Sequence, residues 1–145
     1  MTGVQTCALP ILDAVGLTAG FVIPSTLAAL NLLTAPPGDV LYVKSAPGGV
    51  STTVLREQQF LFYRRVPKMP LYDAVYPTIM YYQDKLEGEG FSRIIVCGNG
   101  GVGRDALEEL HQKAGIPVFQ QDPRNLDDIY KPALGATGLK WANLI

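Results

Sequence analysis

Three short runs of apolar and β-branched residues follow one another early in the chain. They cover residues 39–45, 50–57 and 59–66, and a Pro- and Gly-containing turn at 46–49 separates the first two. Runs of this length bounded by turn residues are typical of strands. Because the connections are short, we expect the three strands to pair as an antiparallel meander.

The hydrophobic period changes to that of a helix over residues 71–86. The apolar positions that would share one helical face are Val75, Ile79, Tyr82 and Leu86. Pro77 is compatible with this helix only if it lies in the first turn, because a proline further along removes a backbone hydrogen bond.

Strand and helix patterns then alternate. Residues 94–97 are typical of a buried strand, residues 105–114 of a helix closed by Gly115, and residues 116–120 of another strand. A final helix at 131–142 contains two glycines, which weaken it. Three strands followed by alternating helix and strand predict an α/β fold built on a mixed sheet.

The part of the chain before residue 38 is predicted to differ from the rest. Residues 1–11 contain no Lys or Arg and so lack the charged region of a signal peptide. They look like the translation of a sequencing-library adapter, so we expect a non-native scar followed by a C-terminal fragment. A genuine apolar arm is the alternative.

Residues 12–37 are interpreted as the end of a preceding subdomain and a linker, with a strand at 20–23 and a short helix capped by Ser25. Residues 38–145 then form the second half-domain. The uncharged stretch at 14–38 leaves a membrane span as the alternative, against which its prolines and polar residues argue.

Composition narrows the function. A hydrophobic content of 48% indicates a packed domain. With 12 basic and 13 acidic residues and a net charge of -1, the chain lacks the positive electrostatic potential that attracts nucleic acid. We predict no nucleic-acid partner. Cys7, Cys97 and His111 do not form the spacing of a zinc site, so no metal ligand and no catalytic residue are assigned.

The stretch IIVCGNGGVGRDALEEL offers candidate binding chemistry. Gly98, Gly100 and Gly103 satisfy G-x-G-x-x-G, and Asp122 follows where a ribose-binding carboxylate is expected in a dinucleotide (NAD) site. However, a Rossmann half begins with the strand before its glycine turn, whereas this chain has a predicted meander upstream. Glycines there also allow backbone to approach a base closely, or serve a turn that binds nothing.

The order of GLTAGFVIPSTLAALNLL, the hairpin, YPTIMYYQDKL, IIVCGNGGVGRDALEELHQKAGIPVFQQDP and ALGATGL resembles the C-terminal portion of the PilM-type actin-like proteins of type IV pilus assembly. The resemblance covers Leu12 to about Leu139. It implies a ribonuclease-H-like (actin-like) half-domain and a cytoplasmic scaffold at the inner-membrane face. Its implied partner is the cytoplasmic tail of an inner-membrane pilus assembly protein, and self-association is also expected. A regulatory NAD-binding Rossmann domain of the potassium-transport type is the alternative.

The same resemblance implies one wall of a nucleotide cleft. The adenosine-side turn would be Gly98, Asn99, Gly100 and Gly101, and the second phosphate loop Gly48 and Gly49. An ordinary hairpin is the alternative for Gly48 and Gly49. ATP is implied for the intact parent, and no cofactor is assigned to this chain by itself. Hydrolytic members carry Asp-x-Gly where this chain has Val43, Lys44 and Ser45, so we expect a pseudo-ATPase.

Overall fold

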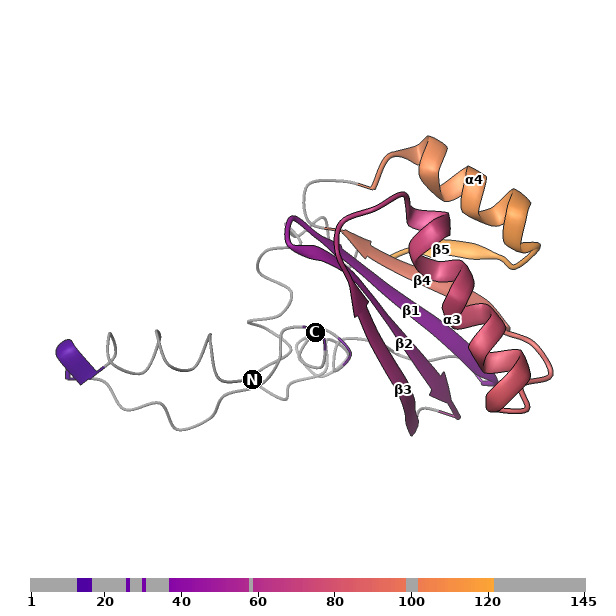
Figure 1. Ribbon diagram of the computed structural model, residues 1–145, viewed down its shortest axis with the longest axis horizontal. Coiled ribbons are helices and arrows are strands. Elements are labelled where there is room, and N and C mark those ends of the chain that lie inside the picture. Colours follow the sequence, from indigo (N-terminus) through magenta and orange to yellow (C-terminus); the bar gives the residue numbers. More distant parts are fainter. Residues whose placement is uncertain are drawn as a thin grey trace, which may run out of the picture.

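The computed structural model describes residues 13–16, 26, 30, 37–57, 59–98 and 102–121. Its centre is a five-stranded sheet in the order β3-β2-β1-β4-β5, which α3 and α4 cover (Figure 1). The elements are β1 (Asp39–Ala46), β2 (Gly49–Arg56), β3 (Gln59–Val66), α3 (Leu71–Lys85), β4 (Arg93–Gly98), α4 (Arg104–Ala114) and β5 (Val118–Gln120).

The predicted meander is confirmed. β1 pairs with β2 and β2 with β3, both antiparallel, whereas β4 lies parallel to the other side of β1 and β5 parallel to β4. The sheet is therefore mixed, as the order of elements predicts. β5 is shorter than expected and begins after Pro117, which has no N–H for a ladder bond. The carbonyl of Pro117 still accepts a hydrogen bond from the N–H of Ile94 at 2.8 Å.

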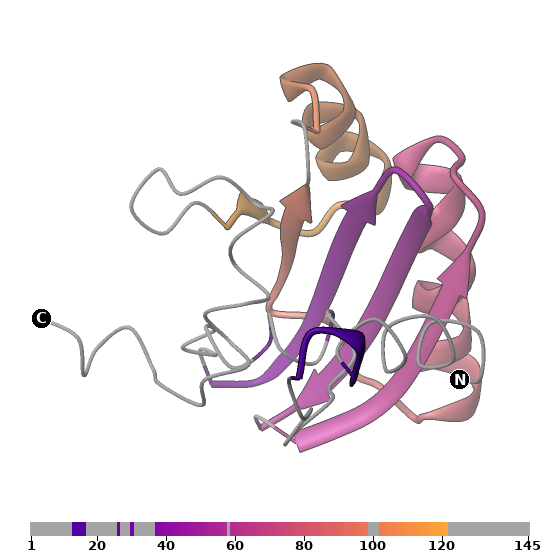
Figure 2. The same ribbon diagram turned by 90° about the vertical axis from the view of Figure 1, so that its left-hand side faces the viewer.

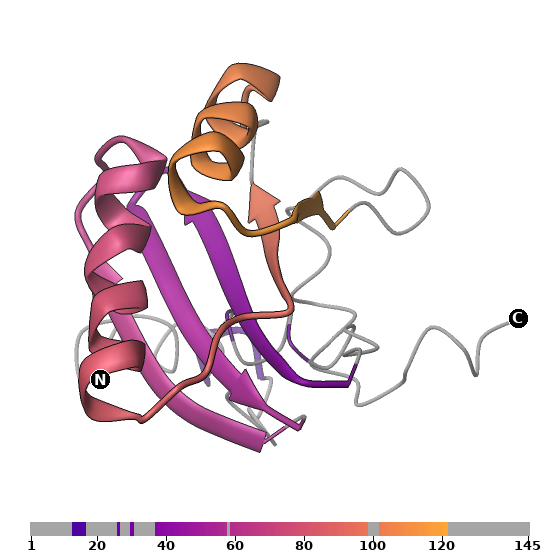
Figure 3. The same cartoon turned by 90° about the vertical axis from the view of Figure 1, so that its right-hand side faces the viewer.

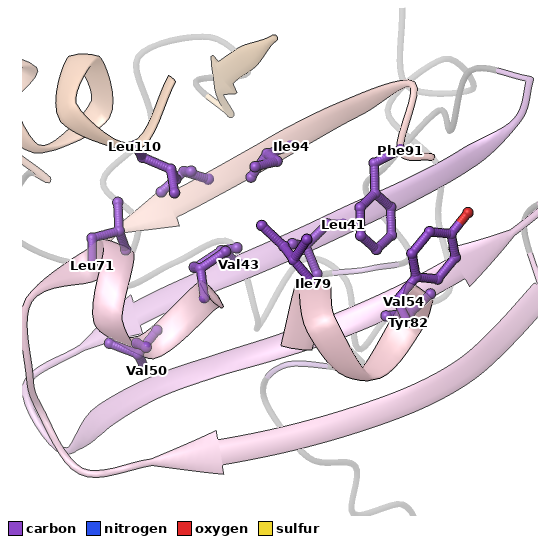
Figure 4. Close-up of a cluster of buried hydrophobic side chains, with 13 residues drawn as sticks. Leu41, Val43, Val50, Val54, Leu71, Ile79, Tyr82, Phe91, Ile94 and Leu110 are labelled. Carbon is purple, nitrogen blue, oxygen red and sulfur yellow. The ribbon is translucent and has the colours of Figure 1, made fainter. Parts of the chain in front are cut away.

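Both helices cover the same face of the sheet (Figure 3). Side chains alternate between the faces of a strand, so Leu41 and Val43 of β1 point toward the helices. There they join a buried cluster whose labelled members in Figure 4 are Leu41, Val43, Val50, Val54, Leu71, Ile79, Tyr82, Phe91, Ile94 and Leu110. This cluster fixes α3 and α4 on the sheet and is the larger of the two cores.

The opposite face, turned to the viewer in Figure 2, carries a second buried cluster. Its members are Val40, Tyr42, Leu55, Ile95 and Cys97. Leu30 packs against this cluster, and the hydroxyl oxygens of Thr26 and Ser51 lie 3.2 Å apart. Residues from before the predicted linker thus contact the face that α3 and α4 leave open.

Pro77 is not in the first turn of α3, so that prediction is wrong. It lies inside the helix, which continues to Lys85. Its ring is on the exposed side, where the carbonyl that loses its partner can bind water. The neighbouring Thr78 is buried, and its hydroxyl oxygen lies 2.8 Å from that of Thr52. Packing against the sheet therefore outweighs the local preference.

β3 is an outer strand of the described sheet, and the charged Arg64 and Arg65 lie on it. Phe60, Leu61 and Tyr63 on this strand are exposed. No helix within the described ranges is long and apolar enough to cross a membrane. The predictions for residues 1–11, 20–23 and 131–142 lie outside the described residues.

Candidate functional site

The fold brings two of the predicted binding segments to one end of the sheet. Ser45 of β1 is in register with Gly98 of the parallel strand β4, and Ala46 pairs with Gly49 across the hairpin. We call this the carboxyl end of the sheet, because β1, β3, β4 and β5 all terminate there; it is uppermost in Figure 2. The turn residues Asn99, Gly100 and Gly101 lie outside the described residues.

The hairpin between β1 and β2 is tight. Only Pro47 and Gly48 separate the two strands, and proline has no N–H to donate. Gly49 has a φ of 141°, and a Cβ there would collide with the carbonyl oxygen of Val66. Strand packing thus explains the glycine, and the loop has few donors with which to hold a phosphate.

Gly98 is buried at the end of β4. A Cβ there would lie 2.6 Å from Cγ2 and 3.2 Å from the backbone nitrogen of Val102. The glycine therefore allows the chain to pass close to its own turn before α4 begins at Arg104. This local packing accounts for Gly98 with or without a ligand.

Lys44 stands where the hydrolytic pattern has a carboxylate. It lies in register with Ser51 on one side and Cys97 on the other and is 8% exposed. By alternation from Tyr42, its side chain is on the face away from the helices. A lysine supplies a positive charge and no metal ligand, so the residues of this strand end do not fit a magnesium ion.

Positive charge gathers at the carboxyl end. The described basic residues there are Lys44, Arg64, Arg65, Lys68 and Arg104, against the acidic Asp73 and Asp105 in the first turns of the helices. Nη2 of Arg65 donates a hydrogen bond to the carbonyl of Gly48 at 3.3 Å. The ion pair of Asp39 with Arg56 lies at the other end of the sheet. That of Glu109 with Lys113 lies beside the first turn of α3, where Nζ of Lys113 is 4.9 Å from the ring centroid of Tyr72.

This cationic cluster was not found from the sequence. Arg64, Arg65 and Lys68 lie within five residues of one another, whereas Lys44 and Arg104 are distant from them along the chain. The net charge of -1 conceals the asymmetry because acidic residues are concentrated elsewhere. The antiparallel pairing of β1, β2 and β3 brings Lys44 to the same end as Arg64 and Arg65, and the parallel pairing of β4 with β1 adds Arg104.

The opposite, amino end of the sheet is linked by side chains. The hydroxyl of Tyr82 donates to Oδ2 of Asp39 at 2.6 Å, and Nε of Arg56 donates to the same oxygen at 3.0 Å. Arg56 also donates to the carbonyl of Leu86 at 3.0 Å. Burial, together with the bond to Asp39, raises the pKa of Tyr82 above its ordinary value. This network joins α3 to the start of β1 and has no arrangement suited to catalysis.

His111 and Cys97, to which the sequence assigns no role, lie apart in the structure. Nδ1 of His111 lies 2.9 Å from the carbonyl oxygen of Ile116, next to the C-terminus of α4. Cys97 belongs to the buried cluster on the other face of the sheet. A thiol and an imidazole on opposite faces do not form a nucleophile and base pair.

No protein-family model matches the sequence, and no curated protein matches it. Solved structures are similar in fold. A chain of a PilM-PilN type IV pilus biogenesis complex matches with a TM-score of 0.69 at 15% identity, over 89% of this chain and 56% of its own. The ethanolamine utilization protein EutJ from Carboxydothermus hydrogenoformans matches with 0.63 at 13% identity, over 93% and 60%.

A Bacteroides thetaiotaomicron protein with an actin-like ATPase fold and unknown function gives a TM-score of 0.50 at 16% identity, over 74% of this chain and 41% of its own. This chain has the fold of an actin-like half-domain. It spans 56% and 60% of the PilM-PilN and EutJ chains.

The alternative prediction of a Rossmann domain is wrong in topology. A Rossmann sheet continues from the glycine-turn strand by alternating parallel strands and helices. Here the strand before the glycine turn, β4, is followed by one parallel strand on one side and by an antiparallel ribbon beyond β1 on the other. Asp122, the predicted ribose ligand, lies outside the described residues.

Proposed function

We propose that this chain is part of an actin-like, non-hydrolysing scaffold protein on the cytoplasmic face of the inner membrane, in type IV pilus assembly or a related secretion machine. The likeness to a PilM-PilN chain over 89% of the sequence is the observation that supports it. The order of the quoted sequence segments supports the same family independently of the coordinates.

The proposed partner is the cytoplasmic tail of an inner-membrane pilus assembly protein. A scaffold of this kind acts by holding a peptide and responding to a change in cleft shape, so it requires no catalytic residues in this chain. The polar side chains of Asp39, Arg56 and Tyr82 form a structural network that would keep the half-domain rigid while a partner binds.

The nucleotide part of the proposal concerns the carboxyl end. Gly98, Asn99, Gly100 and Gly101 are proposed to face the adenosine, and the hairpin with Gly48 and Gly49 the phosphates, with ATP as the ligand of the intact parent. This chain forms one wall of the nucleotide cleft and supplies only part of the hydrogen-bond donors and of the buried surface, so we expect its affinity for ATP to be low. Hydrolysis is not expected, because Lys44 can neither ligate a metal nor activate water.

Binding of the tail peptide tests the scaffold role. The cytoplasmic tail of the pilus assembly protein from the same genome, labelled with a fluorophore, is titrated with the chain and followed by anisotropy. We expect saturable binding that a scrambled peptide of equal composition does not show. Equal binding of both peptides, or of neither, would count against the pilus role. The experiment is needed because the fold matches both the PilM-PilN chain and EutJ, so the fold by itself does not distinguish a pilus role from another role.

Hydrolysis is measured separately. Phosphate release from ATP in the presence of magnesium should not exceed that of buffer. A rate that exceeds that of buffer and rises in proportion to protein concentration would show that the chain is an ATPase.

A further inference from the structure

We propose that the carboxyl end of the sheet binds the polyphosphate of a nucleotide as the free anion, with basic side chains in place of a magnesium ion. The inference rests on the nucleotide wall of the proposed function and specifies the ionic form of its ligand. Tail binding, by contrast, does not depend on it.

The first step is that a metal does not fit. Magnesium is bound through carboxylates together with phosphate oxygens. After Asp39 at the far end, neither the rest of β1 and β2 nor β4 contains an Asp or Glu. Asp73 and Asp105 lie in the first turns of α3 and α4 rather than on these strands. Within the described residues no three His, Cys, Asp or Glu side chains come together as a metal site, and Lys44 at the strand end supplies no metal ligand.

The second step is that Arg65 is placed for phosphate. It is exposed on the outer strand, and its Nη2 already lies on the hairpin, 3.3 Å from the carbonyl oxygen of Gly48. A guanidinium has five N–H donors, so a single bond to a carbonyl leaves the others for ligand oxygens. Its planar fork matches the geometry of a phosphate.

The third step is that side chains, rather than backbone, must supply the attraction. The hairpin contains Pro47 and so has few N–H groups to offer. The exposed Lys68, which follows β3, and the exposed Arg104, which begins α4, add positive charge at the same end. Binding by exposed charges should increase with the number of phosphates and weaken with salt.

The test is calorimetric titration of the full chain with ATP, in EDTA and in excess magnesium at the same low ionic strength. Magnesium lowers the net charge of ATP and competes with the basic side chains. We therefore expect ATP to bind about threefold to tenfold more tightly in EDTA. ADP and AMP should bind progressively more weakly. Tripolyphosphate is titrated as well, because it has the phosphates of ATP without the nucleoside. If it binds more weakly than ATP, the base or ribose contributes to binding.

Two substitutions locate the site. Arg65→Ala should weaken ATP binding in EDTA about tenfold, as expected for loss of a charge-assisted contact. Lys68→Ala should weaken it about twofold to fivefold, and Lys85→Ala is the matched control, because Lys85 lies in the last turn of α3 at the amino end. The control should bind ATP as the unsubstituted chain does.

Tighter binding in magnesium, or equal binding in both buffers, would overturn the proposal. So would an equal loss in the Lys68 and Lys85 variants, since it would show a general effect of charge. Absence of binding by ATP and tripolyphosphate in both buffers would also overturn it. Saturable binding of the tail peptide in that case would leave the scaffold function standing, so the two failures are distinguishable.

Discussion

The two ends of the sheet are built in different ways. At the amino end, Asp39, Arg56 and Tyr82 are joined by hydrogen bonds of 2.6 to 3.0 Å, and the ring of Tyr82 stacks on Phe91 with centroids 3.9 Å apart. At the carboxyl end, β1 ends at the hairpin with Gly48 and Gly49, and β4 ends at Gly98. The first end connects helix to sheet, whereas the second has Arg65, Lys68 and Arg104 exposed.

This difference suggests a division of roles. A network of paired polar groups around a buried ring resists opening, and the same pairing leaves it little capacity to bind anything else. An excess of exposed positive charge contributes little to stability, but it attracts an anion. We therefore expect stability to depend on the amino end and ligand binding on the carboxyl end.

The largest expected effect is that of Tyr82→Ala. Tyr82 is 1% exposed, and its loss leaves a cavity beside Phe91 and removes a donor to Asp39. We expect the free energy of unfolding to fall by about 3–5 kcal/mol, measured by urea denaturation with circular dichroism. Tyr76→Ala is the control, because Tyr76 is 45% exposed on the same helix. Equal losses in the two variants would contradict the special position of the amino end.

A smaller effect is expected for the hairpin. Gly49→Ala should lower the free energy of unfolding by about 2 kcal/mol, because its φ of 141° is strained for alanine and the new Cβ meets the carbonyl of Val66. Gly48→Ala should cost less than about 1 kcal/mol, since only the movable Nη2 of Arg65 lies near, at 3.1 Å. A reversed order would show that the hairpin is not as the structure describes.

Tyr82→Phe tests the hydrogen bond alone. At neutral pH we expect a loss of about 1 kcal/mol. The pKa of Tyr82 is raised in the folded protein, so its contribution is complete below the ordinary value of 10.0 and declines as the pH rises from there through the folded pKa. Urea denaturation from pH 8 upward should show this decline in the unsubstituted chain. If Tyr82→Phe declines equally, another group is responsible.

The smallest effects are expected for the exposed basic residues. Lys68→Ala and Arg104→Ala should leave the free energy of unfolding within about 0.5 kcal/mol of the unsubstituted chain. Thermal and urea denaturation together measure this. A loss above about 1 kcal/mol would indicate a structural role and weaken the contrast between the ends.

Most of the fold follows from local patterns. The strands at 39–45, 50–57 and 59–66 and the helices at 71–86 and 105–114 were predictable within a residue or two, because their hydrophobic periods and bounding turns are strong. Pro77 is the informative exception. Its position inside α3 depends on a buried face that packs on the sheet, which no local preference reveals.

The sequence by itself determined the order of elements, and with it the mixed sheet, because period and turn chemistry act over a few residues. Tertiary structure alone decided which residues meet. The parallel pairing of β4 with β1 brings Arg104 to the end of the sheet where Arg65 lies, and the path of α3 brings Tyr82 to Asp39. Such contacts join residues distant in the chain, so they depend on how the whole sheet packs rather than on local pattern.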